Sequence, residues 1–287
     1  MTIESYIRDL KTNKPVLAAV IGNSVGCGYW STGAPSLPSL CDSNGQLLAS
    51  NRSADAVTGS WVKLLRGDMK ARNPASDLLN FSGNGWNSND HRGIKTAASL
   101  IPSPTDTVAK ILALPVRPSV VYLPLQINDE PLGLSVFETN TRAIISALAA
   151  GGVATVIVKE NYISGSSAHA QFVQKAGDIA ASLGLPCIDT YTPFLLAGDG
   201  LLYDTKHPND KGQMLIYVAH RAWIDNYKID GLNPFVVGRS DVAFKLSDAG
   251  ALRFKDGEVT RAIAVRFGVQ GAVNLKVGDL TCSLVNE

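Results

Sequence analysis

The feature that most constrains the fold is a regular alternation between short, largely apolar runs and longer segments with helical spacing. The apolar runs are strand-sized and cover residues 16–21, 78–81, 119–123, 153–158 and 185–189. Helical patterns lie between them, and two of these patterns stop at glycines, at Gly151 and Gly184. Strands that alternate with helices are joined by crossovers, so they pair in parallel and are buried on both faces. The pattern predicts a flavodoxin-like, three-layer α/β/α fold with a central parallel sheet.

The pattern changes after Asn226, where short runs of alternating β-type residues replace the strand–helix alternation. These runs cover residues 242–246, 262–267 and 272–277. Turn signals such as Asp256-Gly257 separate them. We therefore predict two domains, an α/β domain at residues 1–230 and a small antiparallel β-domain or extension at residues 231–287.

Charge and hydropathy narrow the classes of partner. The chain has 26 Lys and Arg against 25 Asp and Glu, a net charge of +1, and no basic run. Neither nucleic acid nor a membrane is therefore an expected partner. The first residues do not form a secretory signal, and no apolar run reaches transmembrane length. An extracellular or phage-virion location and a cytoplasmic one are both left open.

The cysteines do not suggest a metal site or a disulfide framework. They are Cys27, Cys41, Cys187 and Cys282. No two of them form a Cys-x-x-Cys pair, and none is clustered with histidines at zinc-ligand spacing. We expect free thiols, no metal and no cofactor.

A serine in a glycine-rich turn directly follows the first predicted strand, in Gly22-Asn23-Ser24-Val25-Gly26. A serine hydroxyl is a poor nucleophile unless a neighbouring base takes its proton. Asp204 and His207 are spaced so that the carboxylate can fold back onto one imidazole nitrogen while the other nitrogen faces a serine. Ser24, Asp204 and His207 are therefore the candidate catalytic residues.

Hydrogen-bond donors follow the second and third predicted strands. Gly85 comes after the second strand and Asn128 after the third. Ligands bind at the carboxyl ends of parallel strands, so we expect both residues to lie near Ser24. The backbone N–H groups of Ser24 and Gly85 and the side-chain amide of Asn128 are donors of the type found in oxyanion holes. Gly83 is the alternative to Gly85.

Together these segments resemble the sequence blocks of the SGNH (GDSL) serine hydrolase family. The matching segments are Gly22-Asn23-Ser24, Asn80-x-Ser82-x-x-Gly85, Gln126-Ile127-Asn128-Asp129 and Asp204-x-x-His207-Pro208. They occur in the family's order and spacing over roughly residues 15–226. The resemblance implies the SGNH hydrolase fold for residues 1–230. It also implies a serine esterase that works through an acyl-enzyme.

Two residues depart from the family's blocks. Asn23 replaces the usual aspartate, removes a carboxylate beside the nucleophile and is a possible substrate contact. Gln126 replaces a glycine, and we expect it to form part of the cleft wall, where it would narrow an acyl pocket or contact substrate. The motif around Ser24 also fits the nucleophile elbow of α/β-hydrolases. We reject that interpretation because only one strand precedes Ser24 and because the acid lies so near the histidine in sequence.

Other side chains are weaker candidates for substrate contact. Trp30 and Trp86 follow two of the blocks, so either ring could stack on a sugar or wall an acyl pocket, or lie in the core. His91 is close to the second block and could line the cleft. His169 and His220 lie in helical segments and are expected at the surface or in packing.

The substrate class follows from indirect features. No long apolar insertion could serve as a lipase lid, residues 84–90 are mostly polar, and a β-domain is appended. Members of the family with such domains often act on glycans, so the resemblance favours removal of O-acetyl groups from a polysaccharide. A small-acyl lipolytic esterase or thioesterase is the alternative enzyme. A glycan- or receptor-binding module of the phage-tail type, with a secondary or relict hydrolase site, is the alternative of another class. The β-domain would then also be a route to a homo-oligomer.

Overall fold

The structure is a computed structural model, and it describes two units of the chain, Met1–Asn233 and Pro234–Glu287, each by itself. In the first unit the described residues are 2–32, 41–43, 46–48, 57, 59–97, 99 and 102–227. In the second unit only the backbones of five short strands are described. Among all these residues no helix is long and apolar enough to cross a membrane.

The first unit is built on a five-stranded parallel sheet. Its strands are β1 (Leu17–Val20), β2 (Asp77–Asn80), β3 (Val120–Leu123), β4 (Ala154–Lys159) and β5 (Cys187–Asp189). They lie in the order β2-β1-β3-β4-β5, and Val20 pairs with Asn80 on one side and with Tyr122 on the other. The strand order reverses at β1, so the carboxyl end of β1 is the topological switch point at which such sheets bind ligands. The predicted flavodoxin-like fold is confirmed.

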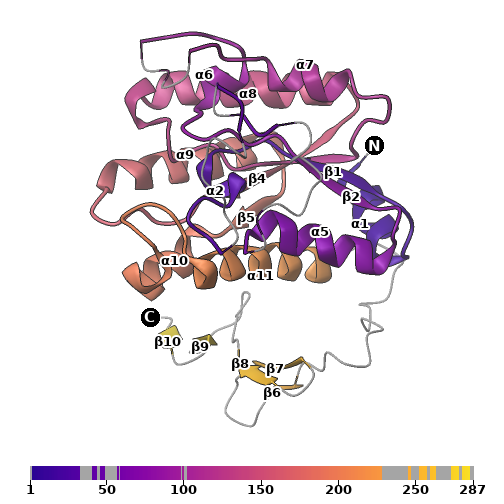
Figure 1. The fold of residues 1–287 in the computed structure, drawn as a ribbon, viewed down its shortest axis with the longest axis vertical. Coiled ribbons are helices and arrows are strands. Elements are labelled where there is room, and N and C mark those ends of the chain that lie inside the picture. Colours follow the sequence, from indigo (N-terminus) through magenta and orange to yellow (C-terminus); the bar gives the residue numbers. More distant parts are fainter. Residues whose placement is uncertain are drawn as a thin grey trace. The chain divides into compact units, whose positions relative to one another are not determined.

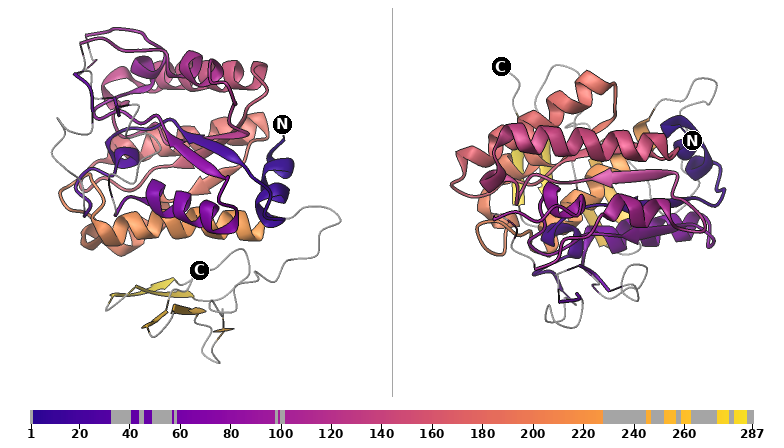
Figure 2. Two further views of the ribbon diagram at one scale, coloured as in Figure 1. Left: turned by 45° about the vertical axis from the view of Figure 1, so that its right-hand side comes forward. Right: turned by 90° about the horizontal axis from the view of Figure 1, so that it is seen from above.

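Helices cover both faces of this sheet (Figures 1 and 2). The helices are α1 (Ile3–Lys11), α2 (Ser24–Cys27), α5 (Trp61–Arg72), α6 (Ser88–His91), α7 (Thr107–Leu112), α8 (Leu134–Ala150), α9 (Ser167–Leu183), α10 (Tyr191–Ala197) and α11 (Asp210–Asn226), with short 3-10 turns at η1 (Glu130–Leu132) and η2 (Gly198–Leu201). Helices α7, α8 and α9 lie on one face, and α5 and α11 pack together on the other. Side-chain caps begin several helices; the Ser166 hydroxyl, for example, accepts from the backbone N–H of His169 at the start of α9.

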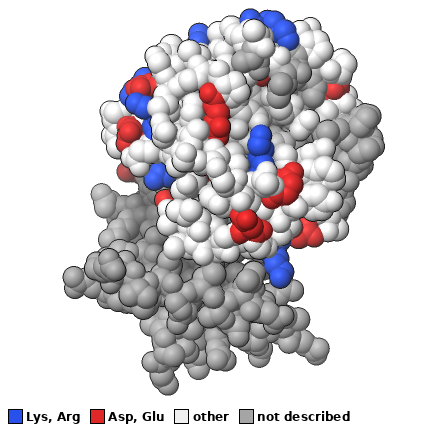
Figure 3. Space-filling view, turned by 90° about the vertical axis from the view of Figure 1, so that its left-hand side faces the viewer, with Lys and Arg blue, Asp and Glu red and all other residues white. Residues whose placement is uncertain are grey.

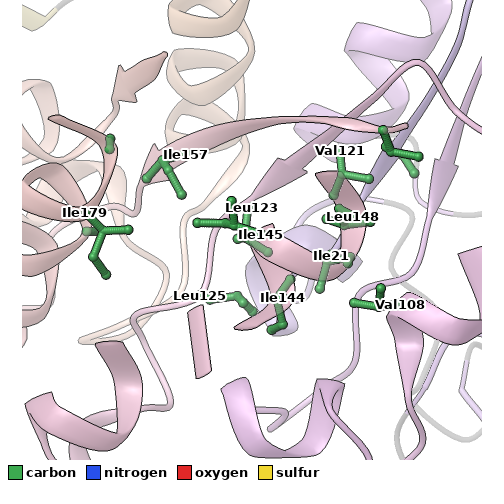
Figure 4. Packing of buried hydrophobic residues seen from close by; sticks show 14 of the residues in the cluster. Ile21, Val108, Val121, Leu123, Leu125, Ile144, Ile145, Leu148, Ile157 and Ile179 are labelled. Carbon is green, nitrogen blue, oxygen red and sulfur yellow. The ribbon is translucent and has the colours of Figure 1, made fainter. Parts of the chain in front are cut away.

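The core explains why the strands are apolar throughout. Val121 and Leu123 of β3 pack in a cluster with residues of α8 such as Ile144 and Leu148 (Figure 4). Tyr122 points to the opposite face, where its ring contacts those of Trp223 and His220 and its hydroxyl hydrogen-bonds to that of Tyr6. Successive residues of a strand point to opposite faces, and here both faces are covered by helices.

The second unit contains short antiparallel pairings. Strands β6 (Lys245–Leu246), β7 (Leu252–Asp256) and β8 (Val259–Ala262) form one sheet, and β9 (Val273–Val277) pairs with β10 (Leu280–Leu284). The predicted β-domain boundary at residues 230 and 231, and the role of this unit in an oligomer, stay predictions.

Candidate active site

Ser24 lies at the switch point, at the first position of the one-turn helix α2 that follows β1. The side chain of Asn23 caps this turn by accepting from the backbone N–H of Val25 at 3.0 Å. Gly28 ends the turn with a φ of 75°, which a side chain would strain. A Cβ atom on Gly26 would collide with the side chain of Ser82, so the turn needs glycine there. The glycines thus allow the turn that carries Ser24, the proposed nucleophile turn, to lie against the end of β2.

The structure brings the three candidate catalytic side chains together. The Oγ of Ser24 lies 2.9 Å from the Nε2 of His207. The Nδ1 of His207 lies 2.8 Å from the Oδ2 of Asp204. The other oxygen of Asp204 accepts from the backbone N–H groups of Lys206 and His207, both at 2.7 Å. The short spacing therefore lets the Asp204 carboxylate hold both the backbone of the loop and the ring of His207.

Electrostatics favour an uncharged imidazole beside an ionised carboxylate. Burial lowers the pKa of His207, and the opposing effect of Asp204 does not restore it to its ordinary value. Burial acts to raise the pKa of Asp204, but hydrogen bonds from His207 and Lys206 outweigh it, so the pKa of that carboxyl lies below its usual range. With Nδ1 donating to Asp204, Nε2 is the free acceptor that faces the Ser24 hydroxyl.

Three donors lie on the turns around Ser24. Within the described part of the chain, the backbone N–H groups of Ser24 and Gly85 have no acceptor. Gly85 has a φ of 73°, so its conformation requires glycine. The backbone N–H of Gly83, the alternative, donates to the carbonyl of Gly22 at 2.9 Å and is not available. The Asn128 amide donates to the carbonyl of Trp86 at 3.0 Å, and an amide has a second hydrogen to give.

Asn23 and Gln126, two predicted substrate contacts, prove to be structural. The amide nitrogen of Asn23 donates to the Oε1 of Glu160 at 2.7 Å, while its oxygen caps α2. Gln126 is 1% exposed, and its side chain bonds to the carbonyl of Val158 and to the backbone N–H of Glu160. The prediction that Gln126 forms the cleft wall is wrong, because both ends of its amide are used inside the protein.

The two tryptophan candidates differ. Trp86 is buried and packs against His91, so of the two alternatives for its ring the core position is the one observed, and stacking on a sugar is ruled out. Trp30 is 42% exposed and stacks on Tyr203 with ring centroids 4.7 Å apart. Tyr29, the residue before Trp30, packs edge-on against the ring of His207, with ring centroids 5.1 Å apart. These aromatic rings thus extend from His207 to the surface.

The remaining histidines lie in the interior. His91 is buried between the carbonyl of Gly22 and the hydroxyl of Thr107, each 2.9 Å from a ring nitrogen. Burial lowers the pKa of His91 to about 3, so the neutral ring donates to Gly22 and accepts from Thr107. The prediction that His91 lines the cleft is therefore wrong. His169 and His220 are also fully buried and serve in packing.

Sequence reasoning missed Tyr203 and Glu160. Tyr203 directly precedes Asp204, so its place beside the site could have been read from its position. Glu160 follows the fourth apolar run, and a charged residue at the end of a buried strand is a signal of the same kind as Asn128.

The described residues contain no group of three His, Cys, Asp or Glu side chains that could hold a metal ion. Cys27, Cys41 and Cys187 carry free thiols, and the side chain of Cys282 lies outside the described residues. That the chemistry needs no metal or cofactor stays a prediction. On the face shown in Figure 3, acidic and basic side chains are interspersed in a larger uncharged area.

Comparison with known proteins yields matches of structure only. No family model and no curated protein matches the sequence. The acetylxylan esterase Axe2 from Geobacillus stearothermophilus is similar over 79% of this chain and 99% of its own, with 17% identity and a TM-score of 0.53. A member of the lipolytic protein G-D-S-L family from Veillonella parvula is similar over 74% and 99%, with 15% identity and a TM-score of 0.51. The predicted resemblance is thereby confirmed at the level of the fold: this chain has the fold of the SGNH/GDSL hydrolases.

Proposed function

We propose that the protein is a serine esterase in which Ser24 attacks an ester carbonyl. The observation that carries this proposal is the continuous hydrogen-bonded line from Ser24 Oγ through His207 to Asp204, placed at the switch point of the sheet. Serine becomes nucleophilic when a base and a group that orients the base are both within hydrogen-bond reach.

The mechanism follows from these contacts. As the Ser24 oxygen bonds to the carbonyl carbon, its proton passes to the Nε2 of His207, and Asp204 stabilises the imidazolium. The N–H groups of Ser24 and Gly85 and the Asn128 amide stabilise the negative carbonyl oxygen. His207 then gives the proton to the leaving alcohol, which leaves an acyl-enzyme. Water, deprotonated by His207, hydrolyses the acyl-enzyme and restores Ser24.

The finer proposal is that the leaving alcohol is a hydroxyl of a glycan and that the acyl group is acetate. The exposed, stacked rings of Trp30 and Tyr203 support it, because flat aromatic faces suit sugar rings. The names of the structural neighbours, which include acetylxylan esterases, favour the same substrate class. A small-acyl lipolytic esterase is the second candidate, supported by the G-D-S-L neighbour's name. Acetate release from acetylated xylan, compared with hydrolysis of aryl butyrate and octanoate, separates the two.

The central test is Ser24→Ala with an aryl acetate as substrate. We expect kcat to fall by about 10⁴-fold or more, because the nucleophile is lost, while the melting temperature stays near that of the wild type. Ser135→Ala, at an exposed position of α8, is the matched control and should keep full activity. A fluorophosphonate probe should label Ser24 in the wild type. Undiminished turnover in Ser24→Ala, or labelling at another residue, would refute the proposal.

A further inference from the structure

Two adjacent polar residues at the carboxyl end of β4 are buried and take no part in the mechanism above. Glu160 is 2% exposed and Asn161 is fully buried. A buried carboxylate is costly unless it is hydrogen-bonded and has a compensating role. Their contacts reach the turns that follow β1 and β3 and the loop that carries Asp204 and His207.

Glu160 joins the turn of the nucleophile to the turn of Asn128. Its Oε1 accepts from the side-chain amide of Asn23 at 2.7 Å, directly before Ser24. Its Oε2 accepts from the backbone N–H groups of Gln126 and Ile127, at 2.5 and 2.7 Å, directly before Asn128. The carboxylate therefore sets the spacing between two turns that carry proposed oxyanion donors.

Asn161 and its neighbours hold the third loop. The Asn161 side chain donates to the carbonyl of Lys206 at 2.9 Å, and the backbone N–H of Ser164 donates to the carbonyl of Thr205 at 2.8 Å. The carbonyl of Asn161 in turn accepts from the Nε2 of His169. The end of β4 thus contacts three of the four segments that supply the proposed catalytic groups; the fourth is the turn after β2, which carries Gly85.

The charges around Glu160 come from two of these segments. Lys206, on the His207 loop, favours the ionised carboxylate of Glu160, and Glu160 in turn raises the pKa of Asp129 on the Asn128 turn. Burial raises the pKa of Glu160 to about 6 in spite of its hydrogen bonds. At neutral pH the carboxylate is therefore mostly ionised, and both of its oxygens are acceptors.

We propose that Glu160 is a positioning residue for the reaction at Ser24. Its carboxylate holds the Asn23 turn and the Gln126–Ile127 turn so that donors on both point at one oxyanion. This inference rests on the esterase function proposed above. It also explains why an amide is needed at position 23: the Asn23 oxygen is taken by the N–H of Val25, so only its nitrogen can meet an acceptor at position 160.

A reciprocal exchange tests this pairing. In Glu160→Gln, an amide nitrogen faces the amide nitrogen of Asn23, and neither orientation of the two amides satisfies all the donors. In Asn23→Asp, two carboxylates face each other across a hydrogen-bond distance. In the double variant, the new carboxylate at position 23 accepts from the new amide at position 160 and from Val25. The oxygen of that new amide accepts from Gln126 and Ile127. Every hydrogen bond is then restored. Only the bond between the two side chains changes direction, because position 160 now donates and position 23 accepts.

The expected result, at pH 7.5 with an aryl acetate, is a loss of kcat of about 10-fold or more in each single variant. KM should stay within about twofold, and the double variant should recover kcat to within about threefold of the wild type. Glu138→Gln, at the solvent-facing ion pairs of α8 and α9, is the matched control and should behave as the wild type. Single variants with wild-type kcat, or a double variant no better than the worse single one, would overturn the inference. A wild-type protein without esterase activity would refute the proposed function instead.

A second measurement decides the matter should Glu160→Gln fail to fold. In Asn23→Asp, one proton shared between Glu160 and the new carboxylate at position 23 restores a donor to the pair, so lower pH should repair the variant. The ratio of its kcat to that of the wild type should rise at least about fivefold between pH 8 and pH 5.5. A ratio independent of pH would overturn the inference.

Discussion

The proposed active site has a rim and a floor that are built in opposite ways. The rim consists of Trp30, Tyr203, Asp204 and His207, and the floor consists of Asn23, His91, Gln126 and Glu160. Trp30, Tyr203 and Asp204 are exposed, whereas each floor residue is at most 2% exposed and hydrogen-bonded at both ends or on both oxygens. Apart from the buried Ser24 hydroxyl beside His207, a rim group can change without leaving a buried partner unsatisfied. A floor group cannot, so its loss costs about 1–3 kcal/mol for each stranded polar atom.

The two histidines beside the nucleophile turn make this comparison testable with one substitution each. His207 contacts the Ser24 hydroxyl from the rim, and His91 contacts the carbonyl of Gly22 from the floor. Their roles should separate into activity and stability.

The largest expected effect is that of His207→Ala. We expect kcat for an aryl acetate to fall by about 10⁴-fold, because the general base is lost. The free energy of unfolding, measured by urea denaturation, should change by less than about 1 kcal/mol, since a rim group leaves few stranded partners. A loss of stability larger than the loss in His91→Ala would contradict the distinction between rim and floor.

His91→Ala should show the reverse pattern. It removes one of the two hydrogen bonds to the Gly22 carbonyl and the hydrogen bond to the Thr107 hydroxyl, and it leaves a cavity under the nucleophile turn. We therefore expect a loss of about 3 kcal/mol in the free energy of unfolding. The catalytic groups remain, so kcat at a temperature where the variant is folded should fall less than about 100-fold. If His91→Ala were as stable as the wild type in the same urea experiment, the buried hydrogen bonds of the floor would not contribute to stability as we expect.

The pH dependence of kcat/KM sharpens the comparison further. As the proposed base, His207 must be neutral, so we expect activity to be lost as pH falls through the pKa of His207. Burial lowers that pKa, which places the midpoint of the acid limb below about pH 6.5. Glu160, with its pKa raised to about 6, titrates in the same window, so the limb should be steeper than a single ionisation. A midpoint above pH 6.5 would contradict the burial of His207. An acid limb with the slope of a single ionisation would contradict a role for Glu160 in the reaction.

The smallest effect on simple turnover is expected for Trp30→Ala. Its ring lies on the rim, where it stacks on Tyr203, and it has no role in the proposed mechanism, so kcat/KM for an aryl acetate should change less than about threefold. For an acetylated xylooligosaccharide, KM should rise about 10-fold, since a stacking surface is lost. Equal effects on both substrates would argue against a sugar at this position. Leu196→Ala, at an exposed residue of α10, serves as the control.

Much of the fold was predictable because its signals are local. Apolar runs of strand length and glycine stops depend on neighbours in the chain, and the sheet and the α8 and α9 ends follow from them. The helix near Trp61 shows the limit. The helical spacing of Val57, Trp61, Leu64 and Leu65 predicts a helix with Ser53 as its N-cap. In the structure the helix begins at Trp61 and is capped by Ser60. Ser53 lies outside the described residues. A distant side chain also contributes to this start, because the Oε1 of Gln213 accepts from the backbone N–H of Trp61.

The sequence by itself determined where chemistry could occur. Parallel strands end at a common edge, so Ser24, Gly85, Asn128 and the Asp204–His207 segment had to lie near one another. Only the tertiary structure decided which buried residues lie beneath those groups and which hydrogen bonds hold them. Whether Gln126 faces a cleft or the interior depends on Glu160 and Val158, which belong to another strand and the turn after it. Hydrogen-bond partners of buried groups come from distant segments, so no local pattern specifies them.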